Sequence, residues 1–392
     1  MTRTSRAGDS DSRISSRRRT PSDQPRSGRR LVAFQALSVA MAFLLTACAA
    51  GIDEMHPPSA EQPLQNLVQR HHICGAAIGF LKSGKLARTE MLAGCPGAAP
   101  PSAHSVFQVA SLSKPVFAYA VLKLVAAGKL DLDAPVLSYL PDGYVHIPQP
   151  WDPASAGERV DAPGLHKVTV RMALNHTSGL PNAASGKLEF ESEPGTRWDY
   201  SGEGYILLQR AAEAVTGWPL DQLMAKLVFE PLRMTDSSYI GRADAQTMPP
   251  DGRALPFTRP VAAYSLSTSL QDYTTFVAAV LADKPMLDTI TRTPVTVDAK
   301  LGLSWGLGWG LERGSDGPNL WHWGNNPGYR AFVMASVKTG DGVVLLSNSE
   351  NGLALAEAAT QQALPGRHGV FSSYLIREGA AHVSCKLVAV CF

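Results

Sequence analysis

The chain has 392 residues, of which 45% are hydrophobic and 18% are charged, and no segment of it is repeated. This length and composition fit a globular protein with one large or two medium domains. The 36 Lys and Arg nearly balance the 34 Asp and Glu. Because the sequence has no basic stripe, Gly-rich phosphate loop or zinc-finger spacing, we expect neither nucleic acid nor a nucleotide as a partner.

The first 47 residues have the pattern of an export signal. Residues 1–30 contain nine Arg and no apolar pattern that could support packing, so we do not expect them to fold. Residues 31–47 form an uncharged run that is short for a membrane span and suits a signal-peptide core. An ordinary secretory peptide and a transmembrane anchor are alternatives, and Arg29-Arg30 alone makes a weaker case for twin-arginine export.

The signal ends in Leu45-Thr-Ala-Cys48, which resembles the signal of bacterial lipoproteins. The resemblance implies that Cys48 is acylated, and Ala49 after it resembles lipoproteins that are sent to the outer membrane. We therefore expect a periplasm-facing protein, anchored to the outer membrane by an N-terminal lipid, with residues 48–63 as a tether. Removal of residues 1–47, with nine Arg and three Asp, changes the formal net charge from +2 to −4.

Four further cysteines suit an oxidising compartment. Cys74 and Cys95 bracket two apolar runs, residues 73–81 and 86–94, which a Lys-Ser-Gly-Lys turn joins. This pattern predicts a β-hairpin with the two cysteines nearly opposite each other, and hence a Cys74–Cys95 disulfide. A second candidate pair lies near the C-terminus: Cys385 and Cys391.

Residues 107–125 are predicted to form one helix, with Ser111 in its first turn and Lys114 three residues later. Positions i and i+3 share a helix face, so a desolvated, neutral Lys114 amine can take the proton of Ser111. The free N–H groups at the helix start can then bind an oxyanion. A Ser-x-x-Lys pair by itself also fits a buried amphipathic helix with no catalytic role.

The pattern after this helix is mostly helical and becomes extended from residue 305. Residues 141–164 are polar and Pro-rich, and we expect an ordered surface insertion near the rim of the site. Helices are predicted at residues 168–174, 205–216, 219–228, 269–282 and 353–364. Strands are predicted at residues 306–311, 320–324, 329–338 and 342–347.

These elements predict an α+β fold, in which an antiparallel sheet is flanked by helices and carries a mostly helical insert. The expected domain covers residues 64–366. Its α/β part comprises residues 64–110 and 290–366, and its helical part comprises residues 111–289. Residues 367–392 are expected to form a C-terminal tail.

Five motifs occur in an order and spacing that resemble the serine β-lactamase and penicillin-binding-protein superfamily. They are Phe-Gln-Val-Ala-Ser-Leu-Ser-Lys at 107–114, Asn-His-Thr-Ser-Gly-Leu-Pro at 175–181, Tyr-Ser-Gly at 200–202, Phe-Glu-Pro-Leu-Arg-Met-Thr at 229–235 and His-Trp-Gly-Asn-Asn-Pro-Gly at 322–328. The chain is most similar to the class C β-lactamase-related branch, which includes esterases, D-aminopeptidases and D,D-carboxypeptidases. The resemblance covers roughly residues 64–366 and implies the same fold.

The resemblance assigns roles to the residues that match these motifs. Ser111 would be the acylated nucleophile and Lys114 its proton acceptor. Tyr200 would move protons during acylation and deacylation. A tyrosine has an ordinary pKa of about 10 and does this work at neutral pH only if a cation lowers that value. Lys114 is the candidate for that cation.

The opposite wall of the site follows from the same resemblance and shows two departures from it. The backbone N–H groups of Ser111 and Asn325 would form the oxyanion hole, beside a strand with His322, Trp323 and Gly324. Gly202 stands where the family usually has an amide-binding asparagine, and His322 stands where many members have a lysine that binds a substrate carboxylate. We expect Arg330 to be the residue that could replace this lysine.

Other candidate sites carry less weight. Gly302-Leu-Ser304-Trp-Gly306 fits the nucleophile elbow of α/β-hydrolases, but no helix pattern or later Asp and His support it, so we interpret Ser304 as a loop match. His71 and His72 are adjacent and point apart, and no His-Glu-x-x-His motif occurs. We therefore expect no metal and no cofactor.

The sequence thus predicts an exported serine hydrolase that works through an acyl-enzyme. Its substrate would be a small molecule or peptide with an ester, amide or D-amino-acid peptide bond. A true class C-like β-lactamase is the alternative among enzymes. A non-catalytic binder or sensor of cell-wall fragments is the alternative of another class, and the joint presence of Ser111, Lys114 and Tyr200 argues against it.

Overall fold

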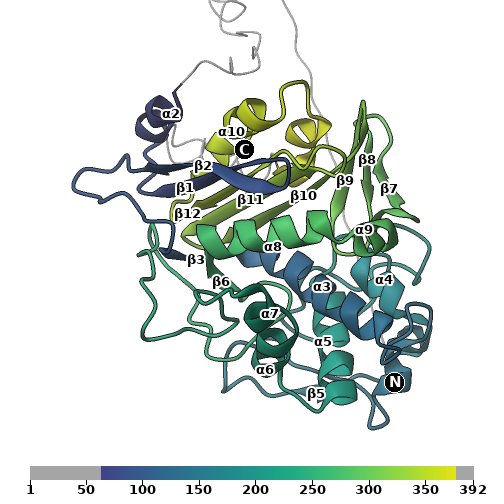
Figure 1. Ribbon diagram of the computed structural model, residues 1–392. Coiled ribbons are helices and arrows are strands. Elements are labelled where there is room, and N and C mark those ends of the chain that lie inside the picture. The colour runs from purple at the N-terminus through teal and green to yellow at the C-terminus, as the bar shows by residue number, and fades with distance from the viewer. Residues whose placement is uncertain (1–62, 377–392) are drawn as a thin grey trace, which may run out of the picture. The chain divides into compact units, whose positions relative to one another are not determined.

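The computed structural model describes residues 63–376, and an eight-stranded antiparallel sheet lies at its centre (Figure 1). The strand order is β2-β1-β12-β11-β10-β9-β8-β7, so the N-terminal hairpin pairs with the last strand. The predicted α+β fold with an antiparallel sheet is confirmed. The strands are β1 Ala76–Lys82, β2 Lys85–Leu92, β7 Val295–Asp298, β8 Leu303–Trp305, β9 Gly310–Gly314, β10 Gly317–Asn326, β11 Tyr329–Ser336 and β12 Gly342–Ser347.

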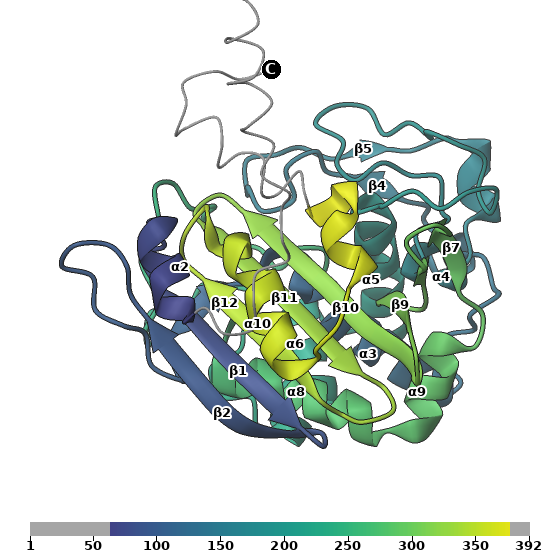
Figure 2. The ribbon, with the colours of Figure 1, turned by 90° about the horizontal axis from the view of Figure 1, so that it is seen from above.

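Helices cover both faces of the sheet (Figures 1 and 2). One face carries α2 (Leu64–Arg70) and α10 (Ala356–Ala363), and the other carries α8 (Leu270–Ala282). Because side chains alternate along a strand, β11 directs Phe332 into the first layer and Val333 into the second. Every residue of β11 and β12 is buried, which explains why these strands are continuous apolar runs.

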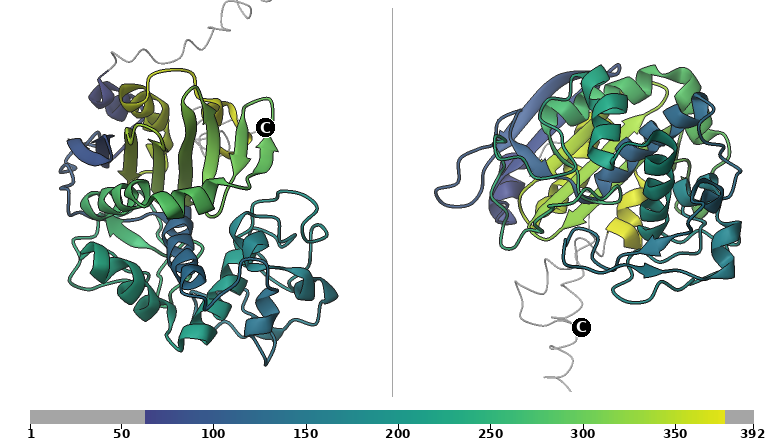
Figure 3. Two further views of the ribbon diagram at one scale, coloured as in Figure 1. Left: turned by 45° about the vertical axis from the view of Figure 1, so that its right-hand side comes forward. Right: turned by 90° about the horizontal axis from the view of Figure 1, so that it is seen from below.

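The helical part of the domain lies on the α8 side of the sheet (Figure 3). Its central helix is α3 (Ser113–Ala126), in which 11 of the 14 residues are buried. A π-helical turn at Ala225–Phe229 separates two of the other helices. None of the helices in residues 63–376 is long and apolar enough to cross a membrane. The others are α4 Val170–Leu174, α5 Glu203–Thr216, α6 Leu220–Met224, α7 Glu230–Leu232 and α9 Lys284–Thr291.

Side-chain caps fix where three of these helices begin. Thr169 accepts the Met172 N–H at the start of α4, and Ser269 accepts the Asp272 N–H at the start of α8. At the start of α9, Asp283 accepts a backbone N–H in the same way. Such caps satisfy N–H groups that have no partner within the helix, and each contributes about 1 kcal/mol.

The structure corrects the helix expected at residues 107–125. Val106–Gln108 form the short strand β3, which pairs with β6 (Ser267–Ser269), and α3 begins only at Ser113. Ser111 therefore lies in a 3-10 turn, Ala110–Leu112, and not in the helix itself. Local periodicity could not show this, because the strand is fixed by pairing with a distant segment.

Two short strands also lie within the segment expected to form a surface insertion, residues 141–164. β4 (Val145–His146) pairs with β5 (Glu158–Arg159). Neither these strands nor α9 and β7 were predicted. All four are short, so their periodicity is too weak to be read from the sequence alone.

The predicted Cys74–Cys95 disulfide is confirmed, with Cα atoms 4.5 Å apart. It closes the base of the β1–β2 hairpin, because Cys74 precedes β1 and Cys95 follows β2. The Gly94 N–H donates to the Ile73 carbonyl at 2.9 Å beside it. The remaining cysteines of the chain lie outside the described residues: Cys48, Cys385 and Cys391.

Candidate active site

Ser111 lies at a sharp turn between β3 and α3. Ala110 before it adopts φ +49°, a backbone conformation that residues with a side chain rarely take. The Ser113 hydroxyl stabilises this turn, since it donates to the Ala110 carbonyl at 2.5 Å and accepts the Leu266 N–H at 2.9 Å. The Val109 N–H also donates a hydrogen bond to the Leu266 carbonyl, at 3.0 Å. The position of Ser111 is therefore fixed by contacts with a distant segment.

Lys114 is buried directly beneath this turn. Its Nζ atom lies 3.1 Å from Ser111 Oγ and 2.8 Å from the Ala263 carbonyl oxygen, and the residue is 1% exposed. Burial lowers the pKa of the amine from 10.5 to about 7, because water no longer stabilises the charged form. At neutral pH a large share of Lys114 is therefore an uncharged amine that can accept the Ser111 proton.

Tyr200 lies on the other side of Lys114, whose Nζ is 4.8 Å from the centre of the phenol ring. Burial raises the pKa of Tyr200, and the nearby Ser111 hydroxyl offsets only part of this rise. The phenol oxygen makes no hydrogen bond of normal geometry with any residue in 63–376. The expectation that Lys114 lowers the tyrosine pKa is wrong, and Tyr200 is a neutral phenol that can donate a proton.

Gly324 allows β10 to approach the Ser111 turn. A Cβ atom at this position would lie 2.2 Å from the Val109 carbonyl oxygen and 3.3 Å from Ala110 Cβ. Such a distance to a backbone oxygen is far inside van der Waals contact, so no side chain fits without moving the strand. The glycine thus sets the distance between β10 and the turn that carries Ser111.

Asn325 follows on the same strand and is exposed. β9 pairs with β10 only as far as Trp321, so the following residues of β10 have a free edge. On the other edge, Asn326 and Tyr329 close a two-residue turn to β11. Hydrogen-bonded and non-hydrogen-bonded pairs alternate in an antiparallel ladder, so the Asn325 N–H points to the free edge. This N–H and that of Ser111 are the candidate oxyanion hole.

Arg330 supports the β10–β11 turn and does not enter the substrate site. Its guanidinium is buried and donates to the Asn326 and Tyr329 carbonyls, both at 2.8 Å. It also forms an ion pair with Glu350, whose second oxygen accepts the Gly328 N–H at 2.7 Å. The expected replacement of the missing lysine by Arg330 is therefore contradicted, because both terminal nitrogens of its guanidinium bind the turn and Glu350.

His322 is fully buried next to these groups. Its Nδ1 atom lies 2.9 Å from the Trp323 carbonyl oxygen, so this nitrogen carries the proton and Nε2 is an acceptor. Burial, and secondly the charge of Lys114, lower the histidine pKa from 6.5 to about 3. His322 is therefore neutral at physiological pH, and the Trp323 ring beside it lies 4.9 Å from the Tyr200 ring.

Comparison with known proteins agrees with this geometry. The family model described as Beta-lactamase matches residues 60–366. The chain belongs to the beta-lactamase family.

The individual relatives share less than a third of their aligned residues with this chain. The chain is 28% identical over 207 residues to Esterase EstB of Burkholderia gladioli, which covers 44% of this chain and 49% of that protein. It is 27% identical over 172 residues to the putative penicillin-binding protein PbpX of Bacillus subtilis, covering 40% and 39%. The chain thus spans about half or less of the length of these relatives. The D-stereospecific amidohydrolase of a Streptomyces species shares the fold, with a TM-score of 0.60, 20% identity and coverage of 78% and 98%.

Two residues that pack against Tyr200 were not identified as site residues from the sequence. The His176 ring lies 4.3 Å from the Tyr200 ring and accepts the Ser201 N–H at 3.1 Å on Nδ1. Trp305 packs 5.0 Å from His176 and 5.4 Å from His322. The Asn-His-Thr-Ser-Gly-Leu-Pro motif contains His176, but its role in packing needed the structure.

Gly202, the second departure from the family pattern, has a structural cause. A Cβ atom at this position would lie 2.4 Å from the Asn182 carbonyl oxygen. The backbone of Asn182 therefore occupies the space that an asparagine side chain at position 202 would need. Gly202 supplies no side chain to a substrate, and it directly precedes the first residue of α5.

The other sequence candidates lie away from Ser111. Ser304 lines a separate pocket, and it lies in strand β8, so its interpretation as part of a loop is wrong. His71 and His72 follow the end of α2. Within residues 63–376, no three His, Cys, Asp or Glu residues come together as a metal site.

Gly324→Ala tests the contact between β10 and the nucleophile turn. The added methyl group would push β10 away from Val109 and displace the Asn325 N–H. We expect the rate of covalent labelling of Ser111 by a fluorophosphonate to fall roughly 100-fold, the usual loss when one oxyanion donor is removed.

Gly186→Ala is the matched control, because a Cβ there has open space. It should keep the wild-type rate, and circular dichroism should show that both variants fold. Unchanged labelling of a folded Gly324→Ala protein would contradict the role of this contact.

Proposed function

We propose that this protein is an exported serine hydrolase that forms an acyl-enzyme on Ser111. The observation that carries the proposal is the buried Lys114 amine, which has a pKa of about 7 and lies 3.1 Å from Ser111 Oγ. The similarity to Esterase EstB and to penicillin-binding proteins supports it. The substrate is an ester, amide or D-amino-acid peptide of a small molecule or peptide, which the named relatives also suggest.

The proposed reaction uses the groups around Ser111 in turn. Neutral Lys114 takes the hydroxyl proton while Ser111 Oγ attacks the substrate carbonyl carbon. The N–H groups of Ser111 and Asn325 stabilise the resulting oxyanion. Tyr200, a neutral phenol, donates a proton to the leaving group. The protonated Lys114 then returns a proton to the Tyr200 phenolate. Water then hydrolyses the ester of Ser111, with Lys114 again as the base.

Neutral esters are the substrates that this site favours in the proposal. His322 is neutral, and both terminal guanidinium nitrogens of Arg330 bind the β10–β11 turn and Glu350. Neither residue offers the permanent charge that a substrate carboxylate needs. A class C-like β-lactamase is the second candidate within the same family. A non-catalytic binder on this fold would not need a nucleophile whose neighbouring amine has so low a pKa.

Covalent labelling of Ser111 tests the proposed chemistry. We expect a fluorophosphonate to add one label at Ser111, located by peptide mass mapping, and Ser111→Ala to abolish it. Because burial places the Lys114 pKa near 7, the neutral amine forms as pH rises. The labelling rate should therefore rise through about pH 7 and level off above pH 8.

Ser304→Ala is the matched control and should label like the wild type. A label on Ser304, or no label on Ser111 at any pH, would refute the proposal. A rate that still climbs steeply at pH 10 would show that Lys114 retains an ordinary pKa.

The neutral charge of His322 predicts a substrate preference. We expect p-nitrophenyl esters of short acids to be hydrolysed with a higher kcat/KM than nitrocefin, which carries a carboxylate. His322→Lys should shift the ratio toward nitrocefin roughly 10- to 100-fold, since a charge-assisted hydrogen bond contributes about 1.5 to 3 kcal/mol. The wild-type ratio should stay constant from pH 5 to 8, because the pKa of His322 is about 3.

His322→Gln provides the neutral comparison and should keep the ester preference. The ratio of kcat/KM values measures each outcome, and melting curves check that the buried lysine is tolerated. Efficient nitrocefin hydrolysis by the wild type would favour the β-lactamase instead.

We also propose that the protein is anchored to the outer membrane through a lipid on Cys48. The motif Leu45-Thr-Ala-Cys48 supports this, although it lies outside the described residues. We expect the mature protein to partition into the detergent phase, and Cys48→Ser to release it or leave the signal uncleaved. An unmodified, soluble mature N-terminus found by intact mass would exclude the anchor.

A further inference from the structure

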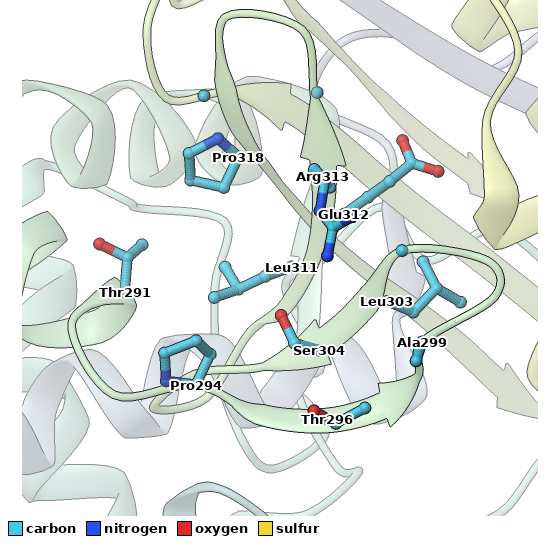
Figure 4. Close-up of a pocket in the computed structure, with 13 residues that line it drawn as sticks. Thr291, Pro294, Thr296, Ala299, Leu303, Ser304, Leu311, Glu312, Arg313 and Pro318 are labelled. Carbon is cyan, nitrogen blue, oxygen red and sulfur yellow. The ribbon is translucent and has the colours of Figure 1, made fainter.

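A cavity of about 390 Å³ lies at the corner of the sheet formed by β7, β8 and β9 (Figure 4). The end of α9 and the loop after it form its other side. A volume of this size is at the small end of the range of ligand sites. Its side chains include Thr291, Thr296, Ser304, Leu311, Arg313 and Pro318.

The strand register brings these side chains together. Thr296 pairs with Ser304, and Ser304 pairs with Leu311 on the next strand, so all three project from one face of the sheet. Arg313 lies two residues further along β9 and therefore shares this face. Trp305, the next residue of β8, belongs to the opposite face and packs against the Tyr200 ring at 5.7 Å. No residue of the Ser111 site lines the cavity.

The charges around the cavity are unbalanced. Glu312 and Arg313 are the two ionisable residues in its lining. The Glu312 carboxylate is already used on the opposite face, where it contacts His368 Nδ1 at 2.6 Å and the Val370 N–H at 3.1 Å. The Arg313 guanidinium has no hydrogen bond or ion pair with any residue in 63–376. The cavity therefore offers one exposed, unpaired cation on the same sheet face as Ser304 and Thr296.

We propose that this cavity binds a small carboxylate with an apolar body. A guanidinium presents two parallel N–H groups that match the two oxygens of a carboxylate. The Ser304 and Thr296 hydroxyls donate to the same oxygens, and Leu311 and Pro318 contact the apolar body. A phosphate group carries more charge and usually recruits more than one cation, so the single Arg313 favours a carboxylate. This binding does not depend on the chemistry at Ser111.

The experiment is isothermal titration calorimetry of the purified protein with hexanoate, with 1-hexanol as the neutral analogue and inorganic phosphate as the competing anion. We expect one hexanoate site and at least tenfold weaker binding of both 1-hexanol and phosphate. Arg313→Gln should weaken hexanoate binding roughly 10- to 100-fold, the loss expected for a charge-assisted pair. Ser304→Leu should abolish hexanoate binding, because the introduced leucine side chain fills the cavity.

Arg292→Gln is the matched control. Arg292 also lies beside the end of α9, but it pairs with Asp288 and does not line the cavity, so this variant should bind hexanoate like the wild type. Every variant should keep its melting temperature and the wild-type fluorophosphonate labelling rate. The proposal is overturned if the wild type releases no heat with hexanoate, or if Arg313→Gln binds it unchanged. It is equally overturned if 1-hexanol or phosphate binds as tightly as hexanoate.

Discussion

The desolvation of Lys114 is the constraint on which the active site depends. In water its amine would be charged and unable to accept a proton at neutral pH. The surrounding helices and rings bury it, and the loss of hydration lowers its pKa to about 7. A carboxylate beside it would raise this pKa again and keep the amine charged. The groups around it are accordingly neutral: His176, Tyr200 and His322.

Backbone geometry supplies the other half of the site. The strained conformation of Ala110 persists because the Ser113 hydroxyl links the Ala110 carbonyl to the N–H of the distant Leu266. Gly324 lets β10 lie against that turn. On the far face of the sheet, Arg330 and Glu350 fasten the β10–β11 turn that follows. The Ser111 turn and the segment of β10 with Asn325, which carry the two candidate oxyanion donors, are thus separate segments that are each held in place, and this suits electrostatic preorganisation.

Sequence reasoning identified the parts of this arrangement that short motifs encode. The Ser-x-x-Lys spacing led to the contact between Ser111 and Lys114, and the cysteine pattern led to the Cys74–Cys95 disulfide. The apolar runs 329–338 and 342–347 led to two central strands.

What the sequence could not reveal depends on segments far apart in the chain. β3 is a strand only because β6 pairs with it. The pKa of Tyr200 rises because of burial, whereas the expected proximity of the Lys114 charge suggested a lowered pKa. Arg330 looked like a free cation until its alternation on β11 placed it on the far face with Glu350 as its partner. Direction and burial of a side chain follow from tertiary packing, which local patterns do not contain.

The pairing of β1 with β12 has a consequence for how the chain folds. The Ser347 hydroxyl donates to the Gly75 carbonyl, a contact between residues 272 positions apart. The central sheet therefore cannot close until almost the whole domain has been synthesised, and closing so long a loop costs conformational entropy before any contact repays it. Folding should be slow and should follow synthesis, and fragments that lack β12 should expose the edge of β11. In the proposed export of this chain across a membrane, late closure would keep the polypeptide competent for transport.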